Sequence, residues 1–300
     1  MTTRSGLVIS RRGLLLAGAG GLLVAACGRG GPSDAAGTAT TTTTAGRLTL
    51  APVFSPQQPA GVEIRLPLAL ADTEGVLVDD VPDRLSVRTG LVPDGALGEP
   101  VMLERHDRGI PRAYFPLVTT FAAPGNWRIA AEADGRPAEM VVAAMDRSQV
   151  PAVPVVGQPL ISLPTPTVDD ARGVEPICTA TPPCPLHVTS LDAAIGGAAD
   201  GNKAIALLIA TPGLCQTAIC GPVLDLLVAR QAEFAETVTM IHAEVYTDDT
   251  ARDTTETVNA YGLAWEPSLF LALPDGTITN RLDYTYDERE LDQALAELVQ

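Results

Sequence analysis

The sequence predicts a β-sandwich followed by an α/β domain, and two observations support this fold class. Short segments with alternating apolar residues fill positions 47–146, the pattern of half-buried antiparallel strands. A continuous apolar run over 204–210 then breaks at Thr211-Pro212-Gly213 and gives way to a helical pattern. Such a run is typical of a central strand that is covered on both faces. We therefore predict an all-β part over 47–146 and an α/β part over 186–300.

Residues 1–26 are predicted to be an export signal rather than part of the fold. Arg11 and Arg12 precede an apolar stretch over 14–26 that is too short to span a membrane comfortably. The sequence Val24-Ala25-Ala26-Cys27-Gly28 resembles a bacterial lipobox. This resemblance implies twin-arginine export, cleavage before Cys27 and lipidation of Cys27 with diacylglycerol and usually a further acyl chain such as palmitate. Two or more chains anchor a protein stably; the alternative is a soluble secreted protein with an incidental cysteine.

Residues 27–46 are predicted to be a disordered tether, because a threonine-rich run among Ala and Gly has nothing to bury. The formal charge of the 300 residues is −16, and loss of the three arginines of the signal takes it to −19. Such acidity argues against nucleic-acid binding. The export signal and the lipid on Cys27 together predict that the protein lies on the extracytoplasmic face of the cell membrane.

The expected strands of the all-β part are spaced as in an antiparallel sandwich. They cover residues 62–69, 85–91, 101–105, 114–121, 127–132 and 138–143. The hairpin FAAPGNWRIAAEADG resembles the late strands of immunoglobulin-like modules. His106, between Glu104 and Asp107, is predicted to lie in a solvated loop, and we assign no chemistry to this part.

Residues 147–185 form a predicted connector with nine prolines, semi-rigid and extended. Cys178 and Cys184 lie at its end, six positions apart. In an oxidising compartment they most simply pair with each other as a structural disulfide. The alternative is that one of them relays electrons to or from Cys215.

The remaining segments complete an α/β pattern. Strands are expected over 204–210, 238–246, 269–273 and 277–282, a short helix over 254–261 ended by Gly262, and a last amphipathic helix from Asp287.

The order of these elements, with two cysteines where the first strand turns into a helix, resembles the thioredoxin superfamily. Pro222-Val223-Leu224-Asp225 matches the family's helix, which implies that Cys215 is the nucleophile and Cys220 the resolving cysteine. Pro267 falls at the position of the family's cis-proline, so Pro267 and Glu266 are expected to shape the substrate groove. Cys220-Gly221-Pro222 permits an alternative register with Cys220 as nucleophile. The family's two cysteines are separated by two residues, whereas Cys215 and Cys220 are separated by four.

This wider spacing sets a geometric condition. Residues five apart in a regular helix are separated by roughly 7.5 Å along its axis, beyond the roughly 7 Å limit between the Cα atoms of a disulfide. A Cys215–Cys220 bridge therefore requires Cys215 to lie before the helix begins.

The predicted function is a membrane-anchored thiol–disulfide oxidoreductase that acts on cysteines of exported proteins, without metal or cofactor. The alternative of another class is a non-catalytic binding or assembly lipoprotein whose disulfides are structural. Two further alternatives rest on resemblance: a peroxiredoxin-like peroxidase, from the C-x4-C spacing, and a thioredoxin-like copper chaperone that would use His242. We expect His242 to be a core histidine, and we expect oxidation of the thiols to preclude zinc binding.

Overall fold

The computed structural model describes residues 47–55, 57–93, 95–195 and 202–300. The predicted export signal, the lipidation site Cys27 and the tether over 27–46 lie outside these residues. The described chain is mostly β-sheet with few helices. None of its helices is long and apolar enough to cross a membrane.

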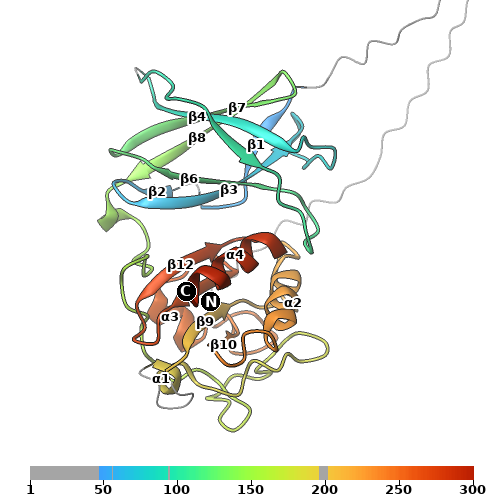
Figure 1. The fold of residues 1–300 in the computed structure, drawn as a ribbon, viewed down its shortest axis with the longest axis vertical. Helices are drawn as coiled ribbons and strands as arrows, with labels where there is room; N and C mark the ends of the chain where they lie inside the picture. Colours follow the sequence, from blue (N-terminus) through green and yellow to red (C-terminus); the bar gives the residue numbers. More distant parts are fainter. Residues whose placement is uncertain (1–46, 56, 94, 196–201) are drawn as a thin grey trace, which may run out of the picture. The chain divides into compact units, whose positions relative to one another are not determined.

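The N-terminal part, residues 47–146, consists of two sheets (Figure 1). Its strands are β1 (Thr49–Pro52), β2 (Gln57–Pro59), β3 (Glu63–Ala71), β4 (Arg84–Leu91), β5 (Val101–Glu104), β6 (Phe115–Thr120), β7 (Gly125–Ala133) and β8 (Arg136–Met145). The sheet orders are β1-β3-β6 and β2-β8-β7-β4-β5. Alternate side chains of both sheets, such as Leu66, Phe115 and Ile129, are fully buried in one core. The six predicted strands are confirmed; β1 and β2 are additional.

The segment after β8 differs from the predicted extended connector. It begins with the 3-10 helix η1 (Arg147–Gln149) and then runs along the C-terminal part. Val153, Leu160 and Leu163 are at most 7% exposed and belong to the core of that part. These apolar side chains between the prolines have a sheet to cover, so the segment is packed rather than solvated.

The C-terminal part, residues 147–300, is built on a sheet of β9 (Ala204–Ile209), β10 (Val238–Ala243), β11 (Ser268–Ala272) and β12 (Ile278–Asp283). The strand order is β10-β9-β11-β12. β9 and β10 are parallel, and β11 is antiparallel to β9 and β12. β9 is central and buried along its whole length, as its continuous apolar run predicts.

Helices and the segment after β8 cover the two faces of this sheet (Figure 1). The helices are α1 (Leu191–Ala194), α2 (Cys220–Arg230), α3 (Glu256–Tyr261) and α4 (Glu288–Leu298). Because successive side chains of a strand point to opposite faces, Leu208 packs in the core with α2 and α4, whereas Leu207 packs in the core with α1 and α3. The predicted helix end at Gly262 is confirmed, since that residue has a φ of 63°.

The first turn of α4 carries contacts to the N-terminal part. Arg65 forms a two-pronged ion pair with Glu290, with both N–O distances at 2.5 Å. His106 Nδ1 lies 2.7 Å from Asp287 Oδ1, and Asp287 is the N-cap of α4. The prediction of a solvated loop for His106 is therefore wrong, because the imidazole is only 12% exposed.

Candidate functional site

Cys215 and Cys220 form a disulfide in the connection from β9 to α2. Cys220 is the first residue of α2, and Cys215 lies in the turn before the helix begins. Their Cα atoms are 6.0 Å apart, within the usual range for a bridge. The predicted geometric condition is thus met.

The two sulfurs of this bridge differ in accessibility. Cys220 is fully buried, whereas Cys215 is partly exposed. Cys215 also lines a cavity of about 790 Å³, and its Sγ lies 3.3 Å from Thr217 Oγ1. An external thiol can therefore approach Cys215 but not Cys220.

Glu266, the residue before Pro267, lies beside the buried sulfur. The Glu266–Pro267 peptide bond is cis, as the resemblance implies, and β11 begins at the next residue. Glu266 Oε2 accepts a hydrogen bond of 2.6 Å from the Thr211 N–H and lies 3.5 Å from Cys220 Sγ. Burial raises the pKa of Glu266 to about 7. This carboxyl group can therefore exchange a proton at the buried sulfur near neutral pH.

The cavity beside Cys215 has mainly apolar walls. Ile219, Tyr246 and Trp265 come from the C-terminal part, and Phe54 and Pro111 from the N-terminal part. Such walls suit an apolar ligand segment.

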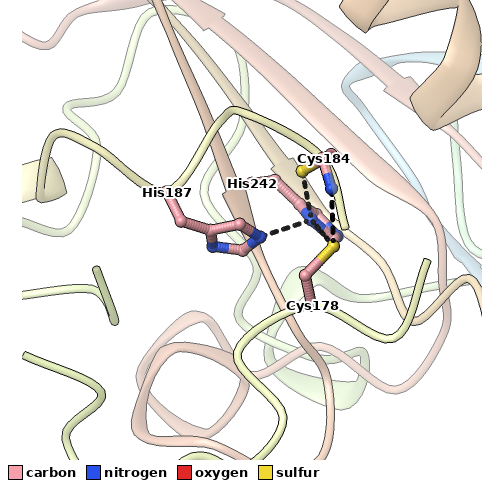
Figure 2. A group of neighbouring side chains, drawn as sticks. All are labelled: Cys178, Cys184, His187 and His242. Carbon is pink, nitrogen blue, oxygen red and sulfur yellow. Dashed lines mark hydrogen bonds between the residues drawn. The ribbon is translucent and has the colours of Figure 1, made fainter. Parts of the chain in front are cut away.

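A second cysteine cluster lies at the edge strand β10. Cys178, Cys184, His187 and His242 turn their ligating atoms toward one another (Figure 2). Cys178 and Cys184 are free, so the structure does not form their predicted disulfide. The Cys184 N–H donates to Cys178 Sγ over 3.2 Å, and the sulfurs of Cys178 and Cys184 lie 3.9 and 3.4 Å from His242 Nδ1. Both sulfurs thus face an imidazole instead of bonding to each other.

Burial and hydrogen bonding define the state of this cluster. Cys178 is 5% exposed, His187 2% and His242 fully buried, whereas Cys184 is partly exposed. The hydrogen bond from the Cys184 thiol lowers the pKa of Cys178 and raises that of Cys184. The cluster therefore favours a thiolate on Cys178.

The histidine rings are oriented by specific contacts. His242 Nε2 lies 3.0 Å from the Ala210 carbonyl oxygen. Because a carbonyl only accepts, Nε2 carries the hydrogen and Nδ1 of the neutral ring has a free lone pair. His187 Nε2 lies 3.1 Å from that Nδ1, and His187 Nδ1 has no partner among the described residues. His242 is a buried strand residue as predicted. Its position beside His187 is not predicted by the sequence, whose only signal is the C-x5-C-x2-H spacing of Cys178, Cys184 and His187.

The two cysteine sites are joined through one loop contact. The Gly213 N–H donates to Thr179 Oγ1 over 2.9 Å. A side chain at Gly213 would come within 2.8 Å of the Thr179 carbonyl oxygen, closer than real Cβ contacts allow. The glycine therefore lets the turn before Cys215 pack against the loop that carries Cys178 and Cys184.

Comparisons with known proteins name no family for this chain. No family model matches it, and neither does any curated protein. Two solved structures of a superoxide reductase (neelaredoxin) from Ignicoccus hospitalis, each of a different variant, are 7% identical to this chain with a TM-score of 0.23. The matches cover 33% and 34% of this chain and 79% and 82% of those chains. A likeness of this size carries no argument about fold or function.

Proposed function

We propose that this protein is a lipid-anchored, extracytoplasmic thiol–disulfide oxidoreductase of the thioredoxin-like type, acting on cysteines of exported proteins. One observation carries the proposal. The Cys215–Cys220 disulfide joins a partly exposed cysteine to a fully buried one, and the sulfur of the buried cysteine lies 3.5 Å from Glu266, which precedes the cis-proline Pro267. This asymmetry supports the proposal that Cys215 attacks and Cys220 resolves.

The topology supports the thioredoxin-like assignment. The order β9-α2-β10-α3-β11-β12-α4, with a parallel β9–β10 pair and antiparallel β11 and β12, resembles the thioredoxin core. In the same way, the two sheets of residues 47–146 resemble an immunoglobulin-like sandwich. In a thioredoxin-like fold, the disulfide would lie at the end of the sheet where the first strand leads into the first helix.

The proposed exchange is balanced in atoms and electrons. A client thiolate attacks Cys215 Sγ; the client–Cys215 disulfide forms, and the Cys215–Cys220 bond breaks. Cys220 leaves as a thiolate and takes a proton from the Glu266 carboxyl group. A second client thiolate then attacks the client sulfur and releases the Cys215 thiolate. The client loses two electrons, which the cysteine pair gains; the reverse sequence reduces a client disulfide.

Glu266 can donate a proton to the buried sulfur of Cys220. A thiolate formed at Cys220 has no water to stabilise it, because the side chain is fully buried. A carboxyl group 3.5 Å away, with a pKa raised by burial to about 7, can give up its proton there and take it back. The apolar cavity beside Cys215 would hold the flanking segment of the client chain.

The membrane anchor belongs to the same proposal. The lipobox-like sequence before Cys27 and the twin arginine support export followed by lipidation. Growth with a labelled fatty acid should label the wild-type protein and leave Cys27→Ala unlabelled.

Trapping of mixed disulfides tests the redox function. Cys220→Ser should accumulate disulfides between Cys215 and exported proteins, because the resolving sulfur is absent. Cys215→Ser should accumulate none. Diagonal electrophoresis without and with reductant would reveal the trapped species. The double variant Cys215→Ser/Cys220→Ser serves as the control and should also accumulate none.

Mild reduction separates this proposal from its main alternative. Dithiothreitol at low concentration followed by alkylation should label Cys215 first in the folded protein. If neither Cys215 nor Cys220 is labelled before unfolding, the bridge is a structural staple, and the protein is a non-catalytic binding or assembly lipoprotein.

A further inference from the structure

We infer that Cys178, Cys184, His187 and His242 bind one zinc ion in a closed, tetrahedral site separate from the redox disulfide. Each of the four residues offers one ligand atom, and these atoms all lie within 4.8 Å of one another. The two Sγ atoms are joined by His187 Nε2 and His242 Nδ1, the ring nitrogens that face each other. Two thiolates and two imidazoles are a usual ligand set of structural zinc.

Three distances between these atoms are close to those of a tetrahedron around zinc. With Zn–S bonds of about 2.3 Å and Zn–N bonds of about 2.0–2.1 Å, two ligating nitrogens lie roughly 3.3 Å apart, and a sulfur and a nitrogen roughly 3.6 Å apart. His187 Nε2 and His242 Nδ1 are 3.1 Å apart. The sulfurs of Cys184 and Cys178 lie 3.4 and 3.9 Å from His242 Nδ1. The four atoms therefore need little movement to coordinate one ion.

The surroundings prepare the ligands. His242 Nε2 is held by the Ala210 carbonyl, which leaves Nδ1 with its lone pair toward the centre, as in metal sites whose histidines are oriented by an outer hydrogen bond. Zn²⁺ with two thiolates and two neutral imidazoles has no net charge, which suits a site that is largely buried. Cys184 is partly exposed, so the ion can enter the site from solvent at this side chain.

The zinc site would stabilise the turn before Cys215. The loop that carries Cys178 and Cys184 also presents Thr179 to the Gly213 N–H, two residues before Cys215. Zinc would join this loop to β10 and so hold the turn before Cys215. With four protein ligands the site is closed, which is typical of structural rather than catalytic zinc.

Metal titration of the purified full-length chain, reduced and treated with a chelator, tests the inference. We expect one Zn²⁺ per chain by competition with a chromophoric chelator. We also expect Co²⁺ to give the visible absorption of a tetrahedral site with thiolate-to-metal charge transfer. Cys184→Ser and His187→Asn should each weaken binding by more than the roughly 10–100-fold that loss of an outer hydrogen-bond partner costs. Circular dichroism would show that each variant is folded.

The matched control is the double variant Cys215→Ser/Cys220→Ser, which removes the other two thiols and should bind zinc as the wild type does. Its binding also separates this inference from the redox proposal. Failure of the reduced wild type to bind zinc would overturn the inference, as would zinc binding that survives loss of Cys178 and Cys184, binding of Cu(I) alone, or a Cys178–Cys184 disulfide in the exported protein.

Discussion

At the scale of single residues, the environment of each sulfur decides what it can do. Cys215 and Cys220 are joined and differ in exposure, whereas Cys178 and Cys184 are free and face imidazole nitrogens. The same residue type therefore occurs in two different environments beside one sheet. Beside the disulfide, burial raises the pKa of Glu266 to about 7.

Glu266→Gln should change the pH dependence of stability. The pKa of Glu266 is about 7 in the folded protein and about 4.3 when unfolded. Between these two values the folded state binds a proton that the unfolded state has lost. The free energy of unfolding therefore falls as pH rises from about 4.3 to about 7. The glutamine variant lacks this loss, so relative to wild type it should gain roughly 1–3 kcal/mol between pH 5 and pH 8.

Chemical denaturation of the oxidised protein at the two pH values measures this gain. The exposed Glu139→Gln serves as the control and should show no such gain. A Glu266→Gln difference that does not vary with pH would contradict the assigned proton.

At the scale of elements, α4 shows how one helix start serves both parts of the chain. Asp287 caps the helix by accepting from the Glu290 N–H, and the same carboxylate contacts His106. Burial would raise the pKa of Asp287, but the hydrogen bonds that its carboxylate accepts from His106 and from backbone N–H groups outweigh this effect, so the pKa is lowered.

Asp287→Ala should destabilise the protein by at least the roughly 0.5–2 kcal/mol of a lost cap, with a further cost for the unpaired His106. Asp287→Asn keeps a good capping group and isolates the loss of charge. Since the folded pKa of Asp287 is lowered, its contribution is present above the unfolded pKa and is lost as pH falls through the folded one. Urea unfolding at neutral and acidic pH should show wild type converging with Asp287→Asn in acid, whereas Asp287→Ala should remain less stable because it lacks a capping group.

Most elements could be predicted from sequence because their patterns are local. The continuous run of β9, the alternation of β3 to β8 and the cap at Gly262 are each written within a few residues. β1, β2 and α1 have only three or four residues, too few for a period to stand out.

The residues of the two cysteine sites also differ in whether the sequence predicts their positions. The Cys215–Cys220 pair and Pro267 could be found from spacing, because short connections set their positions. The cluster at His242 could not, because β10 lies far along the sequence from Cys178, Cys184 and His187. Only the folded sheet brings these segments together, whereas the short spacing of the two neighbouring cysteines predicts a disulfide between them.

At the scale of the whole molecule, a largely buried ion pair links the N-terminal part to α4. Arg65 and Glu290 are 10% and 15% exposed, and Arg65 also donates to the backbone carbonyls of Asp283 and Thr285 over 3.0 and 2.7 Å. Burial would lower the pKa of Arg65, but the Glu290 carboxylate more than offsets this, so the pKa is raised.

Arg65→Ala should cost about 3–5 kcal/mol, because it leaves Glu290 buried without its counter-charge. The exposed pair Arg84–Glu104, with side chains 66% and 55% exposed, provides the matched control. Arg84→Ala should cost no more than about 1 kcal/mol. Calorimetry of both variants would measure how much stability each has lost relative to wild type. Equal losses of stability would contradict a link between the two parts through Arg65.

The packing of Val153, Leu160 and Leu163 into the C-terminal core has a practical consequence for dividing this chain. A fragment cut at residue 186, where the prolines end, would expose the sheet face that these side chains cover and would lack Cys178 and Cys184. A fragment that begins near Arg147 would keep them, so experiments on the C-terminal half in isolation should start there.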